Sequence, residues 1–200
     1  MPVRDALRQL RHEGLLEEDR GNHLRIASFD FESIRDVYAV KAAAHARATR
    51  RATERSTDAE LASLLDIHRE MVRAVDQGDS ADVAVSNWSF HRRINVLARA
   101  PYLVATLRAL PIRFDGSAFH ADVGWTHQCI QEHQEVMQAI TDRGADLAAQ
   151  LMNEHVTHSA EFMISWLSSV RLQNSSSTLD DEVRHSSEFR APLSGSAEIT

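Results

Sequence analysis

Three histidines, His91, His133 and His155, lie on the apolar stripes of three separate amphipathic segments. Because apolar residues recur at helical spacing in each segment, each imidazole is expected on the inward side of a helix. A buried imidazole must find a polar partner, or its burial costs on the order of 1–3 kcal/mol. Asn87 lies one helical turn before His91 on the same stripe. The pattern predicts one divalent transition metal held by the three histidines, with Asn87 as a weaker fourth ligand.

A second interpretation stays open from the pattern alone. A single histidine on an apolar helix face is usually a core residue that is hydrogen-bonded to a neighbour. The sequence also contains no short-range ligand pair such as CxxC or HExxH. If a metal is bound, three neutral imidazoles suit Zn, Ni, Co, Mn or Fe, and they leave coordination positions open.

The elements that carry these residues are expected to be helices. Gly and Pro number only seven and four in 200 residues, whereas good helix formers are plentiful. The last helix is expected to reach about Ser168, and the composition of 173–200, rich in Ser, Asp and Glu without periodicity, predicts a disordered tail. Capping residues, glycines and prolines predict helix boundaries at Asp30, residues 56–60, Gly78, Asp79-Ser80, Pro101, Pro111, Gly116 and Arg143-Gly144.

The first 28 residues differ from the rest. Residues 4–13 are expected to form a helix with Arg4 and Arg8 on its outer face, and the short apolar runs on either side of Gly21 predict a β-hairpin. A short arginine-bearing helix followed by a hairpin is typical of the back half of a winged helix, whose helix enters the major groove of DNA. A solvated basic helix followed by an ordinary turn remains the alternative.

Composition limits the other function classes. The net charge of −7 argues against a surface coated with nucleic-acid-binding charge, so any DNA contact is expected to be local. The single cysteine, Cys129, excludes a disulfide framework within the chain and fits a reducing cytosol. No run of about 18 apolar residues predicts a membrane span, and a cytoplasmic location is expected.

Several motifs together resemble the GntR family of bacterial transcription regulators, in its FadR-type branch with a helical FCD effector domain. The stretch PVRDALRQLRHEGLLEEDRGNHLRIAS resembles the family's recognition helix and wing. NWSFH resembles a D-x-x-x-H motif, Gln131-Glu132-His133 an EH motif, and Met152-Asn153-Glu154-His155 an M-x-x-H motif. The resemblance covers residues 2 to about 170, in the family's order and spacing.

The resemblance implies an all-α fold, an antiparallel bundle of six or seven helices preceded by a partial winged helix. The expected domains are 1–28 for DNA binding, 29–172 for effector and metal binding, and 173–200 as the tail. The resemblance also implies a homodimer that binds a palindromic operator. The metal ligands that the resemblance implies are Asn87, His91, His133 and His155. The DNA contacts that it implies are Arg4, Arg8 and Gly21.

Next to the metal, the family's metal-binding members have a cavity for a small carboxylate. An organic acid is expected to fill the open coordination positions with one carboxylate, while Arg108 or Arg113 pairs with a second one.

Three departures from the family pattern stand out. The first two helices of a winged helix are not in the sequence, so weak operator binding is expected. Asn87 replaces a carboxylate and removes one negative charge from the ligand set. Lys41 and His45 stand where the family commonly has an R-x-x-x-E pair, a change for which the sequence offers no explanation.

The sequence therefore favours a ligand-responsive transcription regulator that binds DNA, a divalent metal and a small carboxylate, and that is not an enzyme. One alternative is a metal-dependent enzyme. Against it, Glu132 and Glu154 adjoin ligands in the sequence but are expected on other helix faces, so no general base is placed among the ligands. The other alternative is a dimerisation module that has lost DNA binding.

Overall fold

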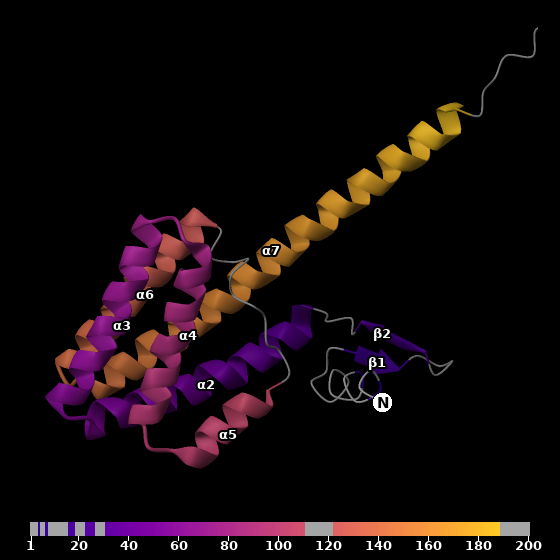
Figure 1. Ribbon diagram of the computed structural model, residues 1–200. Helices are drawn as coiled ribbons and strands as arrows, with labels where there is room; N and C mark the ends of the chain where they lie inside the picture. The colour runs from indigo at the N-terminus through magenta and orange to yellow at the C-terminus, as the bar shows by residue number, and fades with distance from the viewer. Residues whose placement is uncertain are drawn as a thin grey trace, which may run out of the picture. The chain divides into compact units, whose positions relative to one another are not determined.

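The computed structural model describes residues 31–110 and 122–188 continuously, together with residues 4, 7, 16–18 and 23–26. Six helices and one two-stranded sheet occur in these residues (Figure 1). Their bounds are β1 Leu16–Glu18, β2 Leu24–Ile26, α2 Phe31–Arg55, α3 Asp58–Asp76, α4 Ser80–Leu97, α5 Pro101–Ala109, α6 Val123–Thr141 and α7 Ala145–Glu188. The predicted all-α bundle is confirmed.

Local capping explains where the helices begin. The Thr57 side chain and Glu60 form a capping box at the start of α3, and the Asp79 carboxylate accepts hydrogen bonds from the first turn of α4. Asp122 caps α6 in the same way, and Pro101 restarts the chain as α5. The predicted starts near residues 56–60 and at Asp79 are thus confirmed, whereas Asp30 lies outside the described residues.

The helix ends use left-handed residues. Gly78 has φ of 70°, its own N–H donates to the Val75 carbonyl, and the N–H of Asp79 donates to the Ala74 carbonyl, which closes the end of α3. Arg99 and Arg143 occupy the equivalent positions after α4 and α6, with φ of 48° and 59°. The left-handed conformation strains the backbone of both arginines, because it brings Cβ close to a backbone carbonyl oxygen. Both side chains form hydrogen bonds with the corner between α2 and α3.

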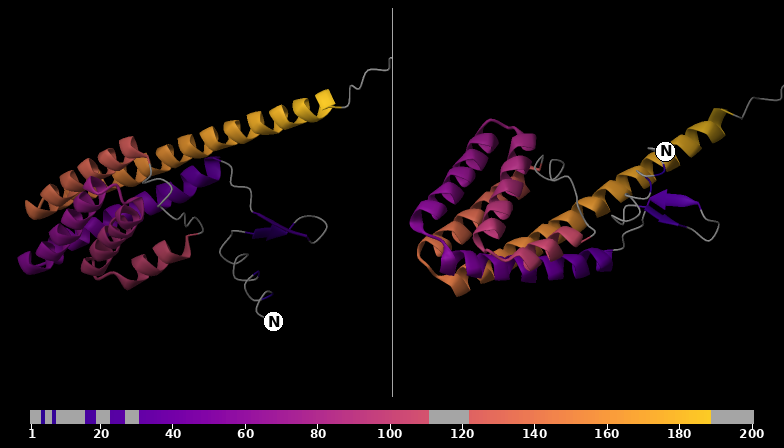
Figure 2. Two further views of the ribbon diagram at one scale, coloured as in Figure 1. Left: turned by 45° about the horizontal axis from the view of Figure 1, so that its top comes forward. Right: turned by 60° about the horizontal axis from the view of Figure 1, so that its bottom comes forward.

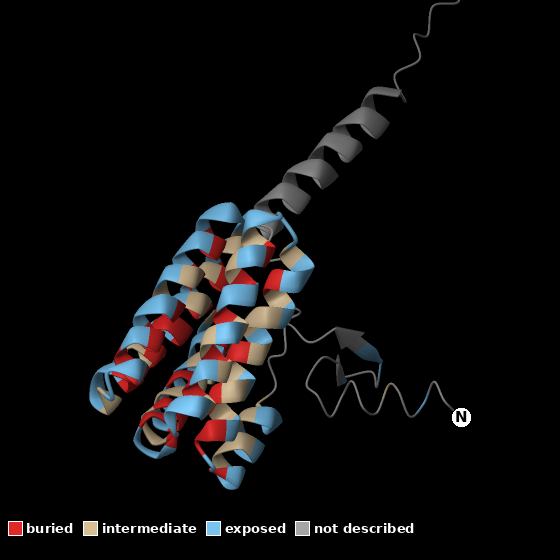
Figure 3. Ribbon diagram, turned by 60° about the vertical axis from the view of Figure 1, so that its left-hand side comes forward, coloured by how far each residue is buried: buried red, intermediate tan, exposed pale blue. Residues whose placement is uncertain are grey.

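The core lies among the bundle helices. Helix α4 packs against both α2 and α3, while α6 packs against α2 and α3 (Figures 1 and 2). Buried residues line the inward faces of these helices and the first turns of α7 (Figure 3). The largest fully buried side chains include Phe90, Leu64, Ile94, Ile140 and Met152. The inward stripes predicted from Ile94, His133, Met137, Ile140 and His155 are therefore correct.

The C-terminal prediction needs correction. Helix α7 does not end near Ser168 but runs to Glu188, so residues 173–188 are helical and not a disordered stretch. The segment from 145 to 188 contains neither Gly nor Pro, and nothing in its backbone chemistry stops the helix. Residues 1–163 and 164–200 form two compact units, and 189–200 lie outside the described residues.

The predicted hairpin is present as strands β1 and β2, which pair antiparallel with Leu16 opposite Ile26. Arg4 and Leu7 are helical, which agrees with the expected N-terminal helix. Gly21 and Arg8 lie outside the described residues. None of the described helices is both long and apolar enough to cross a membrane.

Candidate metal centre

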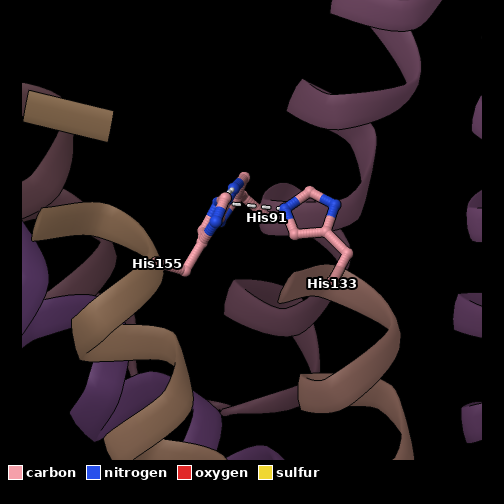
Figure 4. A group of neighbouring side chains, drawn as sticks. All are labelled: His91, His133 and His155. Carbon is pink, nitrogen blue, oxygen red and sulfur yellow. Dashed lines mark hydrogen bonds between the residues drawn. The ribbon is translucent and has the colours of Figure 1, made fainter. Parts of the chain in front are cut away.

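Three imidazoles meet in the interior of the bundle, one each from α4, α6 and α7 (Figure 4). His133 and His155 are buried, and His91 is partly buried. The Nε2 atom of His155 lies 3.0 Å from that of His133 and 3.3 Å from that of His91. The ligand nitrogens of all three residues lie within 4.8 Å of one another. The structure therefore brings together the three histidines that the sequence predicted as ligands.

These separations match those of metal ligands. Nitrogens bound to one ion at about 2.0–2.1 Å lie roughly 2.9–3.4 Å apart when the bond angle is about 90–110°. The two Nε2 separations of 3.0 and 3.3 Å fall within that interval. A hydrogen bond between two neutral imidazoles also spans such a distance, but one lone pair on His155 faces two other nitrogens. An ion among the three nitrogens would satisfy all of them at once.

Glu132 sets the tautomer of His155. Its Oε2 lies 2.7 Å from His155 Nδ1, and an ionised carboxylate only accepts hydrogen bonds. Nδ1 therefore carries the hydrogen, and Nε2 of the neutral ring presents its lone pair to the other two histidines. The sequence did not predict this contact, which arises because α7 brings His155 to the Glu132 carboxylate.

The environment of Glu132 keeps it ionised. Burial alone would raise the pKa of its carboxyl, but hydrogen bonds from His155, Gln128 and His158 outweigh burial and lower the pKa below its usual value. Gln128 Nε2 donates to Oε1 at 2.8 Å, and His158 Nδ1 lies 2.7 Å from the same oxygen. Glu132 thus links the buried His155 to the exposed His158 across one carboxylate.

Aromatic side chains enclose the imidazoles. The Phe90 ring stacks on His133 with a centroid separation of 4.2 Å, and Trp125 lies parallel to His155 at 6.5 Å. Phe90 is fully buried, and Trp125 is 6% exposed. Apolar walls of this kind lower the local dielectric constant and strengthen any charge interaction at the histidine nitrogens.

The other predicted ligands lie in different surroundings. Asn87 is partly buried one turn before His91, and its Oδ1 accepts a long 3.8 Å hydrogen bond from Cys129 Sγ. Its role as a fourth metal ligand stays a prediction.

Arg108 is exposed and lines an open surface groove of about 650 Å³ between the end of α4 and α5, whose lining contains no histidine. Arg113 lies outside the described residues, as do Arg8 and Gly21 among the predicted DNA contacts, while Arg4 is exposed.

Sequence reasoning missed two residues beside the site. The contacts of Glu132 with α7 were not predicted, although His155 and His158, three residues apart on α7, indicate that one helix face carries two imidazoles. His45 on α2 was noted only as a departure from a family pattern. Its ring contacts His91 edge to face, with centroids 5.1 Å apart.

Comparisons with known proteins agree with this architecture. The FCD domain family matches residues 36–158. The uncharacterized HTH-type transcriptional regulator YdhC of Bacillus subtilis is 21% identical over 173 residues, which cover 81% of this chain and 74% of YdhC. The Nta operon transcriptional regulator of Aminobacter aminovorans is 24% identical over 162 residues, covering 78% and 73% of the two chains. Among solved structures, E. coli McbR/YncC shares the fold with a TM-score of 0.71 at 16% identity, over 82% of this chain and 84% of that one.

Proposed function

Because this chain belongs to the FCD-domain family of GntR-type transcription regulators, we propose that its helical bundle is a metal-dependent sensor for a small organic acid. His91, His133 and His155 hold one divalent transition ion, and Asn87 is the candidate for a fourth, weaker donor. The observation that carries this proposal is the convergence of three Nε2 atoms from α4, α6 and α7.

A bound ion would act as a Lewis acid that receives the carboxylate of the effector at its open positions. The chain's own residues supply the rest of the site. Glu132 fixes the His155 ring so that Nε2 faces inward, and Phe90 and Trp125 limit access of water to the imidazoles. Because the three ligands come from three helices, ion and effector binding would alter how α4, α6 and α7 pack.

That packing change is the proposed signal to the DNA-binding segment, in which Arg4, Arg8 and Gly21 are the candidate contacts.

Binding to a palindromic operator requires two copies of the chain. Val85, Trp88 and Val96 expose 62%, 62% and 53% of their surface along one side of α4, and we propose that a second copy covers them. Light scattering should show a dimer for the wild type and a monomer for Trp88→Asp. A dimer in both would place the interface elsewhere.

DNA binding with and without a small organic acid tests the regulatory role. Labelled fragments of the promoter regions beside the gene are titrated with the Zn-loaded wild type in the presence of a panel of small mono- and dicarboxylic acids. At least one acid should change the affinity by about 5- to 150-fold, the usual range of allosteric coupling.

The exposed His127 on α6 provides a matched control for this assay. His127→Ala should respond to the acid as the wild type does, whereas His133→Ala should lose the response. An acid response that persists in His133→Ala would contradict the sensor role of the three histidines.

A further inference from the structure

His45 on α2 is a fourth histidine beside the three proposed ligands. Its ring meets the edge of the His91 ring at a centroid separation of 5.1 Å. Its Nδ1 is shielded from solvent and has no hydrogen-bond partner among the described residues. A buried nitrogen without a partner is uncommon, since it loses its hydrogen bond to water without replacement. Such an atom beside a ligand site indicates that the partner is the ligand.

His45 does not belong to the cluster of metal-ligating nitrogens. Only His91, His133 and His155 have nitrogens that lie within 4.8 Å of one another, among the residues that the structure describes. Direct ligands of one ion lie at most about 4.2 Å apart, twice the metal–nitrogen distance. His45 is therefore not a candidate ligand of the ion itself.

The charges around the site favour an anion as that molecule. Lys41 lies one turn before His45 on α2, and its ammonium group lies 4.7 Å from the Tyr38 ring centroid. A neutral imidazole carries one N–H, which Nδ1 can donate to an anionic oxygen. A divalent ion held by three neutral imidazoles would also favour an anionic oxygen at its open positions.

We infer that His45 donates a hydrogen bond from Nδ1 to a carboxylate oxygen of the small organic acid that occupies the open positions of the metal. This inference rests on the proposed function, and it assigns the second contact of the ligand to α2 in place of the predicted Arg108. Lys41 provides positive charge on the same helix face. His45 is thus a ligand-binding residue of the sensor, whereas the three converging histidines bind the ion.

Acetate binding to the Co(II)-loaded full chain tests the inference, because visible absorption of Co(II) reports both metal loading and a new oxygen ligand. The variants are His45→Ala, His45→Gln and the exposed control His127→Ala. His45→Ala should bind Co(II) as tightly as the wild type but bind acetate about tenfold or more weakly, the usual effect of losing a hydrogen bond to a charged group. His45→Gln, whose amide still donates, should recover part of the affinity, and His127→Ala should match the wild type.

The outcomes separate this inference from the function on which it rests. Unchanged acetate affinity in His45→Ala would overturn the inference while the metal site stands. A parallel loss of Co(II) affinity would also overturn it, because His45 would then be a metal ligand. Failure of the wild type to bind Co(II) would overturn the proposed metal site itself, and the inference with it. Thermal unfolding of each variant shows whether it is folded during the titration.

Discussion

At the scale of single residues, His155 combines two functions on one ring. Its Nδ1 donates to the Glu132 carboxylate at 2.7 Å, and its Nε2 faces the other two imidazoles. The carboxylate therefore determines both the orientation of the ring and the nitrogen that carries the hydrogen. Glu132 is thus the residue that positions His155 as a proposed ligand.

Removal of the Glu132 charge should weaken metal binding without abolishing it. Glu132→Gln keeps the size of the side chain but loses the carboxylate that orients His155, and the expected loss of Zn affinity is about 10- to 100-fold. Competition with a chromophoric chelator measures this affinity. Glu135→Gln, an exposed change three residues further along α6, is the matched control and should leave the affinity as it is. Equal affinities for both variants would show that Glu132 has no part in the metal site.

Asn87→Asp tests whether position 87 contacts the ion. A carboxylate adds an anionic oxygen to a set of neutral donors, so the variant should bind divalent ions more tightly, with a larger gain for Mn than for Zn. Parallel titrations of Mn and Zn into both chains measure the difference. If the variant binds neither ion more tightly, Asn87 is not a metal ligand and its contact with Cys129 is structural.

At the scale of secondary-structure elements, the helix ends depend on two arginines in a conformation that usually favours glycine. Arg143 Nη1 donates to the Thr53 and Ser56 carbonyls at 3.1 and 2.5 Å, and Nη2 pairs with Asp58 at 2.5 Å. Arg99 reaches the Arg55 carbonyl and Glu60 in the same corner. The α2–α3 corner is therefore held to the ends of α4 and α6, the helices that carry His91 and His133.

Two substitutions at Arg143 separate strain from hydrogen bonding. Arg143→Ala keeps the left-handed strain and loses the contacts to α2 and α3, which should reduce the free energy of unfolding by about 1–3 kcal/mol. Arg143→Gly loses the same contacts but relieves the strain, so it should be about 1 kcal/mol more stable than the Ala variant. Urea unfolding of the three proteins measures this order. An Ala variant as stable as the wild type would contradict the proposed role of these contacts.

The elements were largely predictable because their signals are local. Thr57, Asp79 and Pro101 each affect the backbone within one turn, and the starts of α3, α4 and α5 follow from them. The contact of Glu132 with His155 was not predictable, because it depends on the rotation of α6 against α7. The position of His45 beside His91 likewise depends on the packing of α2 against α4, which no spacing within either helix encodes.

At the scale of the whole molecule, the buried histidines link stability to pH. Burial lowers the pKa of His45 from 6.5 to about 4, so the unfolded chain binds a proton at a higher pH than the folded chain. The stability associated with the neutral ring is therefore fully present above pH 6.5 and is lost as the pH falls toward 4.

Urea unfolding of the metal-free chain and of His45→Gln at several pH values isolates this contribution. Between pH 7.5 and pH 4.5 the wild type should lose roughly 2–3 kcal/mol more unfolding free energy than His45→Gln, as a shift of one pKa unit corresponds to about 1.4 kcal/mol. Because the two proteins share every other titratable group, only the difference between their pH profiles is diagnostic. Parallel pH profiles would show that His45 is not buried as a neutral group.

The central claim is that three histidines from three helices hold one ion, and X-ray absorption of the Zn-loaded protein combined with metal analysis tests it most directly. The purified chain, stripped with chelator and reloaded, should contain one equivalent of Zn, with imidazole nitrogens at about 2.0–2.1 Å and a coordination fit that requires three of them. His133→Ala should lose most of the bound metal. The opposite result, with no metal retained by the folded wild type after addition of Zn, Ni or Mn, would show that His91, His133 and His155 form a hydrogen-bonded core cluster and not a metal centre.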